Sequence, residues 1–578
     1  FLVGAGTADR VRGGVCGTRW YALVMHQHTS LTRRLAWEFT FGVSALGLAG
    51  PVLAGGAVID ERFVEWSGAD LVATDALGDA PLGVFDLGRV WAKGSGSELF
   101  VSFEMFGDEA NLQAGPAQGG PQLWVGVPGG SDVNVFFRAR TVSVGDLSSV
   151  ADHFVNEVPW AAVDFALLPT VASTRYEMRV DLSAVGIGAG DEVLIDFAVP
   201  GVQGGAAPGS SLSEFVSPDA LDAPVSVVMG PADAVGELPG RGVGRSAGTT
   251  LRVASLNTLA SGLLDGDPVR SGRFDRLLRS AAADVYCFQE QAGSPQQIAD
   301  RLAQIDPLGD GAAWNVHTDP EGGSFSSDYI ASPLPLTPVE DPPLTDAYAA
   351  AVVGDDPSDA VLVLSVHPAC CGFVGSSSDQ GRIAEAEDTA AMLARFRAGQ
   401  ISAALAPFAG VPVVVIGDWN LVGSDTPREI LTDPAGPGLS HDVLLNLDRR
   451  DAMSWRSSSG FGFAPGLLDL CASSRDGLDF IDGFVVDTAD LSGGELAAAG
   501  LEAGDSLASD HLLLVADFRP AERRPDADGD GLVGLGDLLA VLGGFGETGV
   551  LLEGDVDDDL TVGLADLLAV LGAFGAAF

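Results

Sequence analysis

Six short polar motifs contain the residues with which this chain could catalyse a reaction. Each motif follows an apolar run of the kind that forms β-strands, such as Val361–Val366 or Val411–Ile416. Side chains at the ends of packed strands converge at one edge of a sheet, so motifs distant in sequence can meet at one site. In chain order the motifs are Asn257, Gln289-Glu290, His367, Gly417-Asp418-Trp419-Asn420, Leu468-Asp469 and Ser509-Asp510-His511.

These residue types suit the hydrolysis of a phosphoester. That reaction needs the charge on the phosphate neutralised, a water oriented in line and a leaving oxygen helped to depart. Carboxylate and amide oxygens are ligands for hard cations, so Asn257, Glu290 and Asp510 are predicted to hold Mg²⁺ or Mn²⁺. Imidazole titrates near neutral pH, so His511 is the candidate for proton transfer or phosphate contact.

The order of the six motifs resembles that of the endonuclease/exonuclease/phosphatase superfamily, also called DNase-I-like, and the resemblance covers nearly all of residues 251–520. It implies a four-layered α/β sandwich with two central mixed sheets. The implied activity is that of a metal-dependent hydrolase acting on ester bonds. In roles taken from the resemblance, Asp469 orients His511, Asp418 positions the attacking water or a second ion, Asn420 donates to a phosphate oxygen and His367 acts from the opposite side of the phosphate.

The chain departs from the family pattern near the fifth motif. Leu467-Leu468 stand where many members have a basic residue, so one phosphate contact is expected to be missing. Arg382, on the helical stretch after His367, is the candidate for a phosphate contact or a supporting role. The Cys370-Cys371 pair beside His367 is expected to pin its loop by disulfide bonding.

The sequence leaves the substrate class open. A phosphodiesterase or nuclease is the first expectation, and a small-molecule phosphomonoesterase is equally compatible with the fold. A sphingomyelinase-like phospholipase C is a related alternative, although the sequence shows no aromatic hairpin for membrane insertion. The formal net charge of -48 disfavours tight non-specific binding to nucleic acid. The alternative from another class is a non-catalytic surface protein that binds glycans and is anchored through its C-terminal repeats.

A chain of 578 residues is expected to form several domains. Within 251–520, β-like runs alternate with helical stretches such as Arg273–Ala282, which predicts an α/β layered domain. Residues 57–228 hold short β-like runs between turns, which predicts a β-sandwich, and their first third loosely resembles carbohydrate-binding and DOMON-type domains. A stretch at 229–250 reads as a linker. Candidates to stack on a glycan, although aromatic residues are more often core, are Trp66, Trp91, Trp124 and Trp160.

The C-terminal segment 525–576 contains a duplicated acidic loop in which Asp526 recurs as Asp555. Carboxylates at positions 1, 3, 5 and 12, with a carbonyl at 7, match the calcium loop of EF-hands. The repeats resemble a type I dockerin, which implies small helical calcium-binding repeats and a cohesin-type partner. The predicted calcium ligands are Asp526, Asp528, Asp530, Leu532 and Asp537 in the first repeat, and Asp555, Asp557, Asp559, Thr561 and Asp566 in the second.

The N-terminal residues predict export. Residues 1–24 precede Met25 and are expected to be a mis-called start, and 25–54 have the basic start, short apolar middle and small residues of a signal peptide. The apolar run is too short for a comfortable membrane span. We therefore expect a secreted protein, extracellular or at the cell surface, with no transmembrane segment in the mature chain.

Overall fold

The computed structural model describes most of the chain after residue 55, and the predicted start and signal peptide (1–24 and 25–54) lie outside the described residues. No helix in the described part is long and apolar enough to cross a membrane. The described residues are 56–75, 86–106, 109–113, 122–127, 130–137, 140–145, 156–199, 219–221, 224–232, 242–309, 312–319, 327–340, 348–474, 477–520, 527, 533–546, 554–556 and 561–575.

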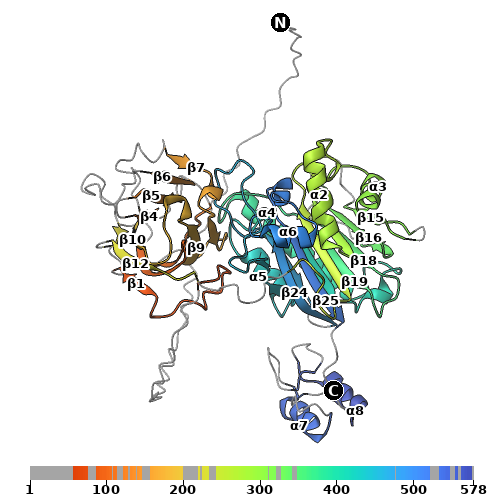
Figure 1. Cartoon of the computed structure of the whole chain (residues 1–578). Helices are drawn as coiled ribbons and strands as arrows, with labels where there is room; N and C mark the ends of the chain where they lie inside the picture. The colour runs from red at the N-terminus through yellow and green to blue at the C-terminus, as the bar shows by residue number, and fades with distance from the viewer. Residues whose placement is uncertain are drawn as a thin grey trace, which may run out of the picture. The chain divides into compact units, whose positions relative to one another are not determined.

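Two mixed sheets lie at the centre of residues 251–520 (Figure 1). In spatial order, the described strands of the first sheet are β15 (Asn315–Thr318), β16 (Tyr329–Ser332), β14 (Val285–Gln289), β13 (Leu251–Asn257), β25 (Leu513–Pro520), β24 (Leu478–Val486) and β22 (Leu445–Asn446). Those of the second are β17 (Leu336–Pro338), β18 (Tyr348–Val353), β19 (Val361–Val366), β20 (Val413–Asp418), β23 (Asp469–Ser473) and β21 (Ser440–Asp442).

The central strands, such as β18, β19 and β20, are buried on both faces, which explains their nearly continuous apolar sequences. In β14, Val285 and Cys287 enter the core between the two sheets, whereas Tyr286 and Phe288 enter the core on the outer face. This alternation follows from the two-residue period of a strand. Each sheet therefore has one face toward the other sheet and an outer face on which helices can pack.

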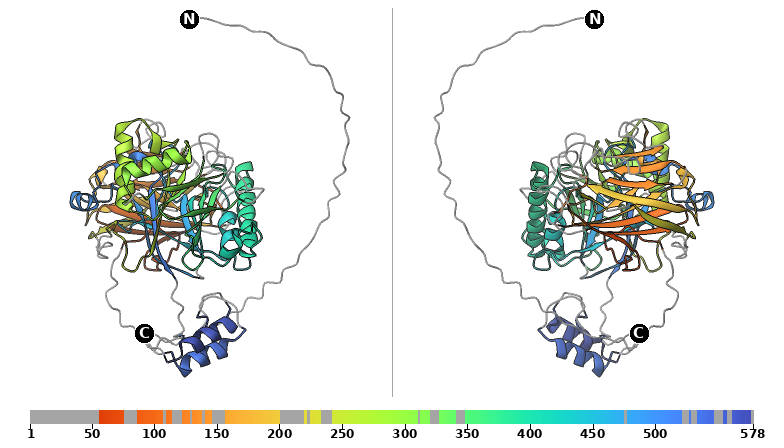
Figure 2. Two further views of the ribbon diagram at one scale, coloured as in Figure 1. Left: turned by 90° about the vertical axis from the view of Figure 1, so that its right-hand side faces the viewer. Right: turned by 90° about the vertical axis from the view of Figure 1, so that its left-hand side faces the viewer.

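Helices cover the outer face of each sheet, so residues 251–520 form a four-layered α/β sandwich (Figure 2). Helices α2 (Pro268–Ala281), α3 (Pro295–Ile305) and α6 (Gly493–Ala499) pack on the first sheet. Helices α4 (Ser377–Arg397) and α5 (Thr426–Thr432) pack on the second. Asp267 begins α2 by accepting a hydrogen bond from the backbone N–H of Val269, a common N-cap arrangement.

The sequence predicted a β-sandwich for 57–228, and in the structure the described strands of this front β-domain join into one hydrogen-bonded sheet. The connection is a short parallel pairing of Met229 and Gly230 with Gly94 and Ser95. Its described strands are β1 (Leu71–Thr74), β2 (Asp86–Ser95), β3 (Glu98–Phe106), β4 (Gln122–Gly126), β5 (Asp132–Phe136), β6 (Thr141–Gly145), β7 (Glu157–Val158), β8 (Ala166–Leu168), β9 (Arg175–Asp181), β10 (Glu192–Val199), β11 (Asp219–Ala220) and β12 (Val225–Gly230).

The two halves of this sheet nevertheless share one apolar core. Phe103 on β3 and Phe197 on β10 belong to different halves, and their ring centroids lie 4.6 Å apart. Val180 on β9 and Val125 on β4 lie in the same buried cluster. The sheet therefore encloses its core by folding back on itself, which gives the packing expected of a sandwich without a second separate sheet.

The four tryptophans considered for glycan stacking are buried, which contradicts that role for them. A ring that stacks on a sugar must present a face to solvent, and none of these does. Their exposed fractions are 9% for Trp66, 6% for Trp91, 7% for Trp124 and 3% for Trp160. Trp66, Trp91 and Trp160 pack in apolar clusters, and the indole N–H of Trp66 donates a hydrogen bond to Glu177.

Parts of the predicted linker 229–250 pack against neighbouring segments, although most of its described residues are exposed. Strand β12 includes residues 229 and 230, and residues 233–241 lie outside the description. Val243 is buried in the core beside α2. Arg245 forms a salt bridge of 2.8 Å with Asp284, and the backbone N–H of Ser246 donates to Asp517. This segment is thus part of the α/β domain surface.

The C-terminal segment contains two equivalent helices, α7 (Leu535–Gly544) and α8 (Leu564–Ala573). A small core of valines, including Val541 and Val570, lies between them. Asp537 and Asp566 are fully buried, and each accepts a hydrogen bond from a backbone N–H of its own loop. The internal repeat of the sequence therefore corresponds to a repeat of structure.

Candidate active site

The six motifs meet at one edge of the two sheets. Strands β13 and β14 are parallel and belong to the first sheet, while β19 and β20 are parallel and belong to the second. Asp469 lies opposite Asp418 in the antiparallel pairing of β23 with β20. Asn257 ends β13, Glu290 follows β14, His367 follows β19, Asp418 ends β20, Asp469 begins β23, and Asp510 and His511 precede β25.

Gly417 is required by the close approach of β20 to β19. Its φ is +152°, and a Cβ placed on it would lie only 2.2 Å from the carbonyl oxygen of Val366. Directly after it, Asp418 Oδ1 accepts a hydrogen bond of 2.9 Å from the backbone N–H of Asn420. Asn420 itself has a φ of +51°, a conformation that asparagine tolerates better than most residues. The backbone conformation of the Gly-Asp-x-Asn motif therefore directs the side chains of Asp418 and Asn420 into the site.

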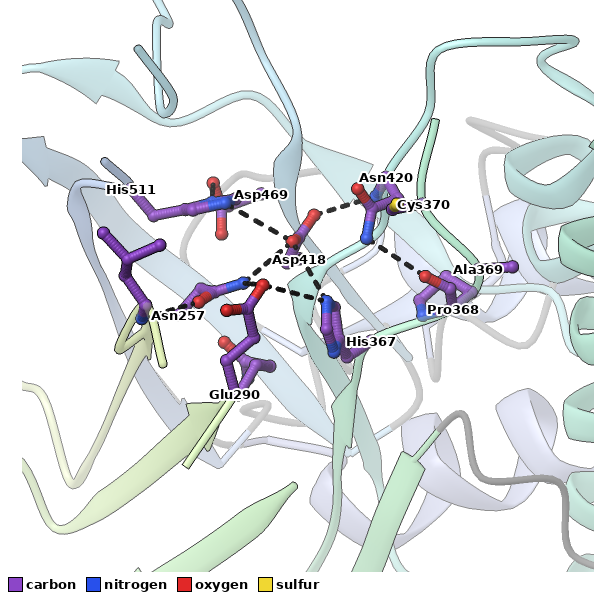
Figure 3. A network of polar contacts seen from close by, with 12 residues as sticks. Asn257, Glu290, His367, Pro368, Ala369, Cys370, Asp418, Asn420, Asp469 and His511 are labelled. Carbon is purple, nitrogen blue, oxygen red and sulfur yellow. Dashed lines mark hydrogen bonds and ion pairs between the residues drawn. The ribbon is translucent and has the colours of Figure 1, made fainter. Parts of the chain in front are cut away.

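Asp418 is the centre of the polar network (Figure 3). Its Oδ2 accepts a hydrogen bond of 3.1 Å from Asn257 Nδ2 and lies 3.6 Å from Nε2 of His367 and 3.5 Å from Nε2 of His511. Glu290 Oε1 lies 3.3 Å from the same Asn257 nitrogen and 3.8 Å from His367 Nε2. One carboxylate thus connects residues from both sheets.

His511 and Asp469 form a buried hydrogen-bonded pair. His511 Nδ1 lies 2.8 Å from Asp469 Oδ2, which also accepts a hydrogen bond of 2.9 Å from the Ser454 hydroxyl. Burial alone would lower the pKa of His511, but the carboxylates of Asp469 and Asp418 overcome it and raise that pKa to about 10. The pair leaves the second ring nitrogen of His511 facing Asp418.

The acidic side chains of the site fit a divalent cation. Glu290, Asp418 and Asp510 line one cavity, and burial together with repulsion from the other two raises the pKa of Asp510, although His511 opposes this shift. A cluster of like charges of this kind is stabilised by a cation with a preference for hard oxygen ligands, such as Mg²⁺ or Mn²⁺. Asn257 presents its amide nitrogen to the carboxylates and its oxygen to the backbone N–H of Leu259. In this arrangement Asn257 donates to the carboxylates, and its predicted role as a cation ligand stays a prediction.

A second grouping is tighter but is already paired. Among the described residues, Asp418, Asp469 and His511 offer atoms that all lie within 4.8 Å of one another. The Asp469 oxygen and the His511 nitrogen in question are joined by their own hydrogen bond. Glu290, Asp418 and Asp510 also line the cavity, and the ion-pair partners that the described residues offer to Glu290 and Asp418 are histidines.

The cavity at the site measures about 200 Å³. Sequence reasoning found its polar residues but missed the aromatic wall formed by Trp455 and Phe463, and missed Gln113 and Thr170 of the front domain. Nothing in the sequence distinguishes these four residues from ordinary core and loop positions. The full lining is Gln113, Thr170, Glu290, His367, Cys370, Cys371, Asp418, Asn420, Val422, Trp455, Phe463, Leu468, Asp510 and His511.

Arg382 does not contact the cavity, so the predicted phosphate contact is not present in this structure. Its side chain is fully buried, and Nη1 donates hydrogen bonds of 2.8 Å to the carbonyl oxygens of Ala369 and Cys371. It therefore supports the loop after His367. The expected disulfide in that loop is not formed either: Cys370 and Cys371 are exposed free thiols with sulfur atoms 2.7 Å apart.

The calcium loops lie largely outside the described residues. Asp537, Asp555, Thr561 and Asp566 are described, whereas Asp526, Asp528, Asp530, Leu532, Asp557 and Asp559 are not. The two described position-12 carboxylates, Asp537 and Asp566, are buried and turned toward their own loops. The calcium assignment therefore remains a prediction from the loop spacing.

Searches with the sequence found no matching family model and no matching curated protein. Solved structures of similar fold include the human Nocturnin catalytic domain with bound sulfate, at 15% identity and a TM-score of 0.31 over 47% of this chain and 94% of that chain. Truncated TDP2 of Caenorhabditis elegans is similar at 14% identity and a TM-score of 0.30, over 46% and 97%. An endonuclease/exonuclease/phosphatase from Bacteroides vulgatus is similar at 13% identity and a TM-score of 0.33, over 47% and 99%.

Proposed function

We propose that residues 251–520 form a divalent-metal-dependent phosphoesterase that hydrolyses a phosphodiester by in-line attack of water. The observation that carries this proposal is the convergence of the Asp469–His511 pair and the acidic residues Glu290, Asp418 and Asp510 on one cavity. A buried imidazole that is held by one carboxylate and faces others is an arrangement that serves proton transfer next to a cation. The proposal includes export of the protein, which rests on the sequence of 25–54 alone.

Each residue has a physical role in this proposal. Glu290 and Asp418, with Asp510, hold Mg²⁺ or Mn²⁺, and a bound cation of this kind stabilises negative charge on phosphate oxygens. Asp469 fixes the His511 ring through Nδ1, so that Nε2 faces the reacting phosphate or its attacking water.

Asn420 and His367 complete the site. Asn420 Nδ2 donates a hydrogen bond of 3.0 Å to the carbonyl oxygen of Pro368, which ties the loop after β20 to the loop after His367. The nitrogen can exchange this partner for a phosphate oxygen. His367 lines the same cavity from β19 and is placed to donate to phosphate or to the leaving oxygen.

To test this, the purified chain is incubated with Mg²⁺ or Mn²⁺ and each of four substrates, and hydrolysis is measured. The substrates are bis-p-nitrophenyl phosphate, p-nitrophenyl phosphate, sphingomyelin and plasmid DNA. We expect cleavage of a diester and a loss of at least about a hundredfold in kcat/KM for His511→Ala, as is typical for a general acid or base. The matched control is His317→Ala, on β15 and outside the cavity.

Other results lead to other functions. Turnover of p-nitrophenyl phosphate alone indicates a phosphomonoesterase, and turnover of sphingomyelin indicates a phospholipase C. A folded protein that cleaves none of the four with either cation refutes the phosphoesterase proposal and favours a non-catalytic surface protein. Removal of the cation with a chelator must abolish cleavage, and thermal unfolding followed in parallel separates this loss from loss of the C-terminal calcium repeats.

A second function, attachment to a partner protein, is favoured by the C-terminal helices. Each carries a row of exposed apolar side chains at matching positions, which on a soluble surface marks an interaction site. The rows are Leu535, Leu539, Leu542 and Phe545 on and after α7, and Leu564, Leu568, Leu571 and Phe574 on and after α8. We propose a cohesin-type partner, tested by calorimetric titration of a type I cohesin domain with calcium. Absence of heat, or equal affinity after Leu539→Asp combined with Leu568→Asp, refutes it.

A further inference from the structure

An aromatic wall stands beside the catalytic imidazole. The Trp455 ring centroid lies 6.5 Å from that of His511 and 6.3 Å from that of Phe463, with edge-to-face geometry in both cases. Backbone pairing fixes this wall, because Ser454 and Arg456 hydrogen bond across to the residues that flank His511. Neither aromatic side chain is fully buried, and both line the cavity.

The front β-domain closes the same cavity. Gln113 and Thr170 are each 3% exposed and line it. Thr170 Oγ1 donates a hydrogen bond of 2.7 Å to the carbonyl oxygen of Leu467, and Gln113 Nε2 donates one of 2.9 Å to that of Ala464. Both acceptors lie on the loop between Trp455 and Asp469. The front domain therefore holds the segment that carries the aromatic wall.

Arg140 of the front domain supports the wall from behind. Its guanidinium carbon lies 3.7 Å from the centroid of the Phe463 ring, a cation–π distance. Its Nη2 donates a hydrogen bond of 2.9 Å to the carbonyl oxygen of Gln113. One arginine thus joins the front-domain lining to the aromatic lining.

Two domains held this firmly act as one site. The Arg179 guanidinium of the front domain forms an ion pair of 2.7 Å with Asp451, and both side chains are almost entirely buried. Asn111 Nδ2 donates to the carbonyl oxygen of Val422, in the loop that follows Asn420. These contacts tie both loops of the cavity to the front domain.

The aromatic wall and the charge of the chain favour one class of substrate. The cavity of about 200 Å³ is partly open to solvent, so a ring of benzene size, which fits a cavity of roughly 150 Å³, has room against the wall. A net charge of -48 repels a polyanion. We infer that the substrate is a small phosphoester whose organic group contains a single planar ring, and that the front β-domain forms part of the wall that binds this ring.

This inference rests on the proposed phosphoesterase function for the position of the phosphate, next to Glu290 and Asp418. The ring then lies against Trp455 and Phe463. It gives the front domain a role in substrate selection that does not require its buried tryptophans to face a ligand.

The experiment measures binding without turnover. Phenylphosphonate and methylphosphonate, whose P–C bonds resist hydrolysis, are titrated into the purified chain with Mn²⁺ in a calorimeter. We expect phenylphosphonate to bind at least about tenfold more tightly, because burial of a ring is worth more than the roughly 1.4 kcal/mol that corresponds to tenfold. Phe463→Leu and Arg140→Ala should each reduce that preference by about two- to tenfold.

Matched controls separate the outcomes. Arg89→Ala, an exposed arginine elsewhere on the front domain, should keep the full preference, and thermal unfolding checks that each variant is folded. Equal affinity for the two phosphonates, or a preference unchanged in both wall variants, overturns the inference even when bis-p-nitrophenyl phosphate is still cleaved. A higher kcat/KM for plasmid DNA than for the aryl diester also overturns it. Ring-selective binding without any hydrolysis refutes the proposed function alone.

Discussion

Asp469→Asn tests the electrostatic origin of the His511 protonation state. The substitution keeps the size of a side chain that is 2% exposed but removes the charge 2.8 Å from His511 Nδ1. An opposite charge at such a distance raises a pKa by about 1–3 units. The pKa of His511 is about 10 in the native protein and should therefore fall by about 1–3 units in the variant. Asp418 remains, so the pKa should stay above the value that burial alone would give.

The direction of the change follows from the charge of each state. In the native site the imidazolium is favoured by two carboxylates, so the proton is lost only well above neutral pH. In the variant one carboxylate remains and burial opposes the charged ring more effectively, so the proton is lost at lower pH. A shift of one unit corresponds to about 1.4 kcal/mol, so the weakening of the imidazolium is roughly 1–4 kcal/mol.

The assay is titration of the His511 ring by NMR in cation-free protein, compared between native chain and Asp469→Asn. A chelator would remove the proposed catalytic cation and also any calcium in the predicted C-terminal loops, but the residues of these loops do not line the cavity. Ser454→Ala, which removes the other hydrogen bond to Asp469 without removing charge, is the matched control and should lower the pKa less. Equal values for His511 in the native protein and in Asp469→Asn would refute the electrostatic argument.

Three further predictions concern stability. Arg179→Ala leaves the Asp451 carboxylate buried without its partner and should lower the free energy of unfolding by about 3–5 kcal/mol, measured by denaturant titration. In Gly417→Ala the new Cβ would lie 2.2 Å from the Val366 carbonyl oxygen, whereas in Gly493→Ala it would have no atom within 4 Å. Gly417→Ala should therefore lower the free energy of unfolding several-fold more than Gly493→Ala. Burial raises the pKa of Glu177 from 4.5 to about 7, so the folded state keeps a proton that the unfolded state loses. The free energy of unfolding should therefore fall by up to about 3 kcal/mol as the pH rises from 4.5 to 7. Urea titrations at about pH 4.5 and 8 should show that Glu177→Gln removes this contribution.

The catalytic layers were predictable because their cues are local. Continuous apolar strands such as β19 are typical of sheets buried on both faces, and the polar residue after each strand marks the sheet edge. The positions of Glu290 and Asp418 follow from these cues alone. By contrast, the role of Arg382 depends on which carbonyl oxygens fold back over it, and helix periodicity does not contain that information. Its full burial is a tertiary property.

The front domain shows why the rest of the site could not be predicted. Gln113 and Thr170 precede the nearest catalytic motif by many residues and belong to a domain with its own core, so no spacing rule connects them to His511. Their contribution depends on a docked interface, and the ion pair of Arg179 with Asp451 that helps to hold it looks in the sequence like two ordinary surface charges. A buried pair of this kind gains little net stability but imposes a large cost on any misaligned arrangement. The interface therefore specifies the geometry of the cavity, and a change in the front domain should alter which ring the site accepts before it alters how fast the phosphate reacts.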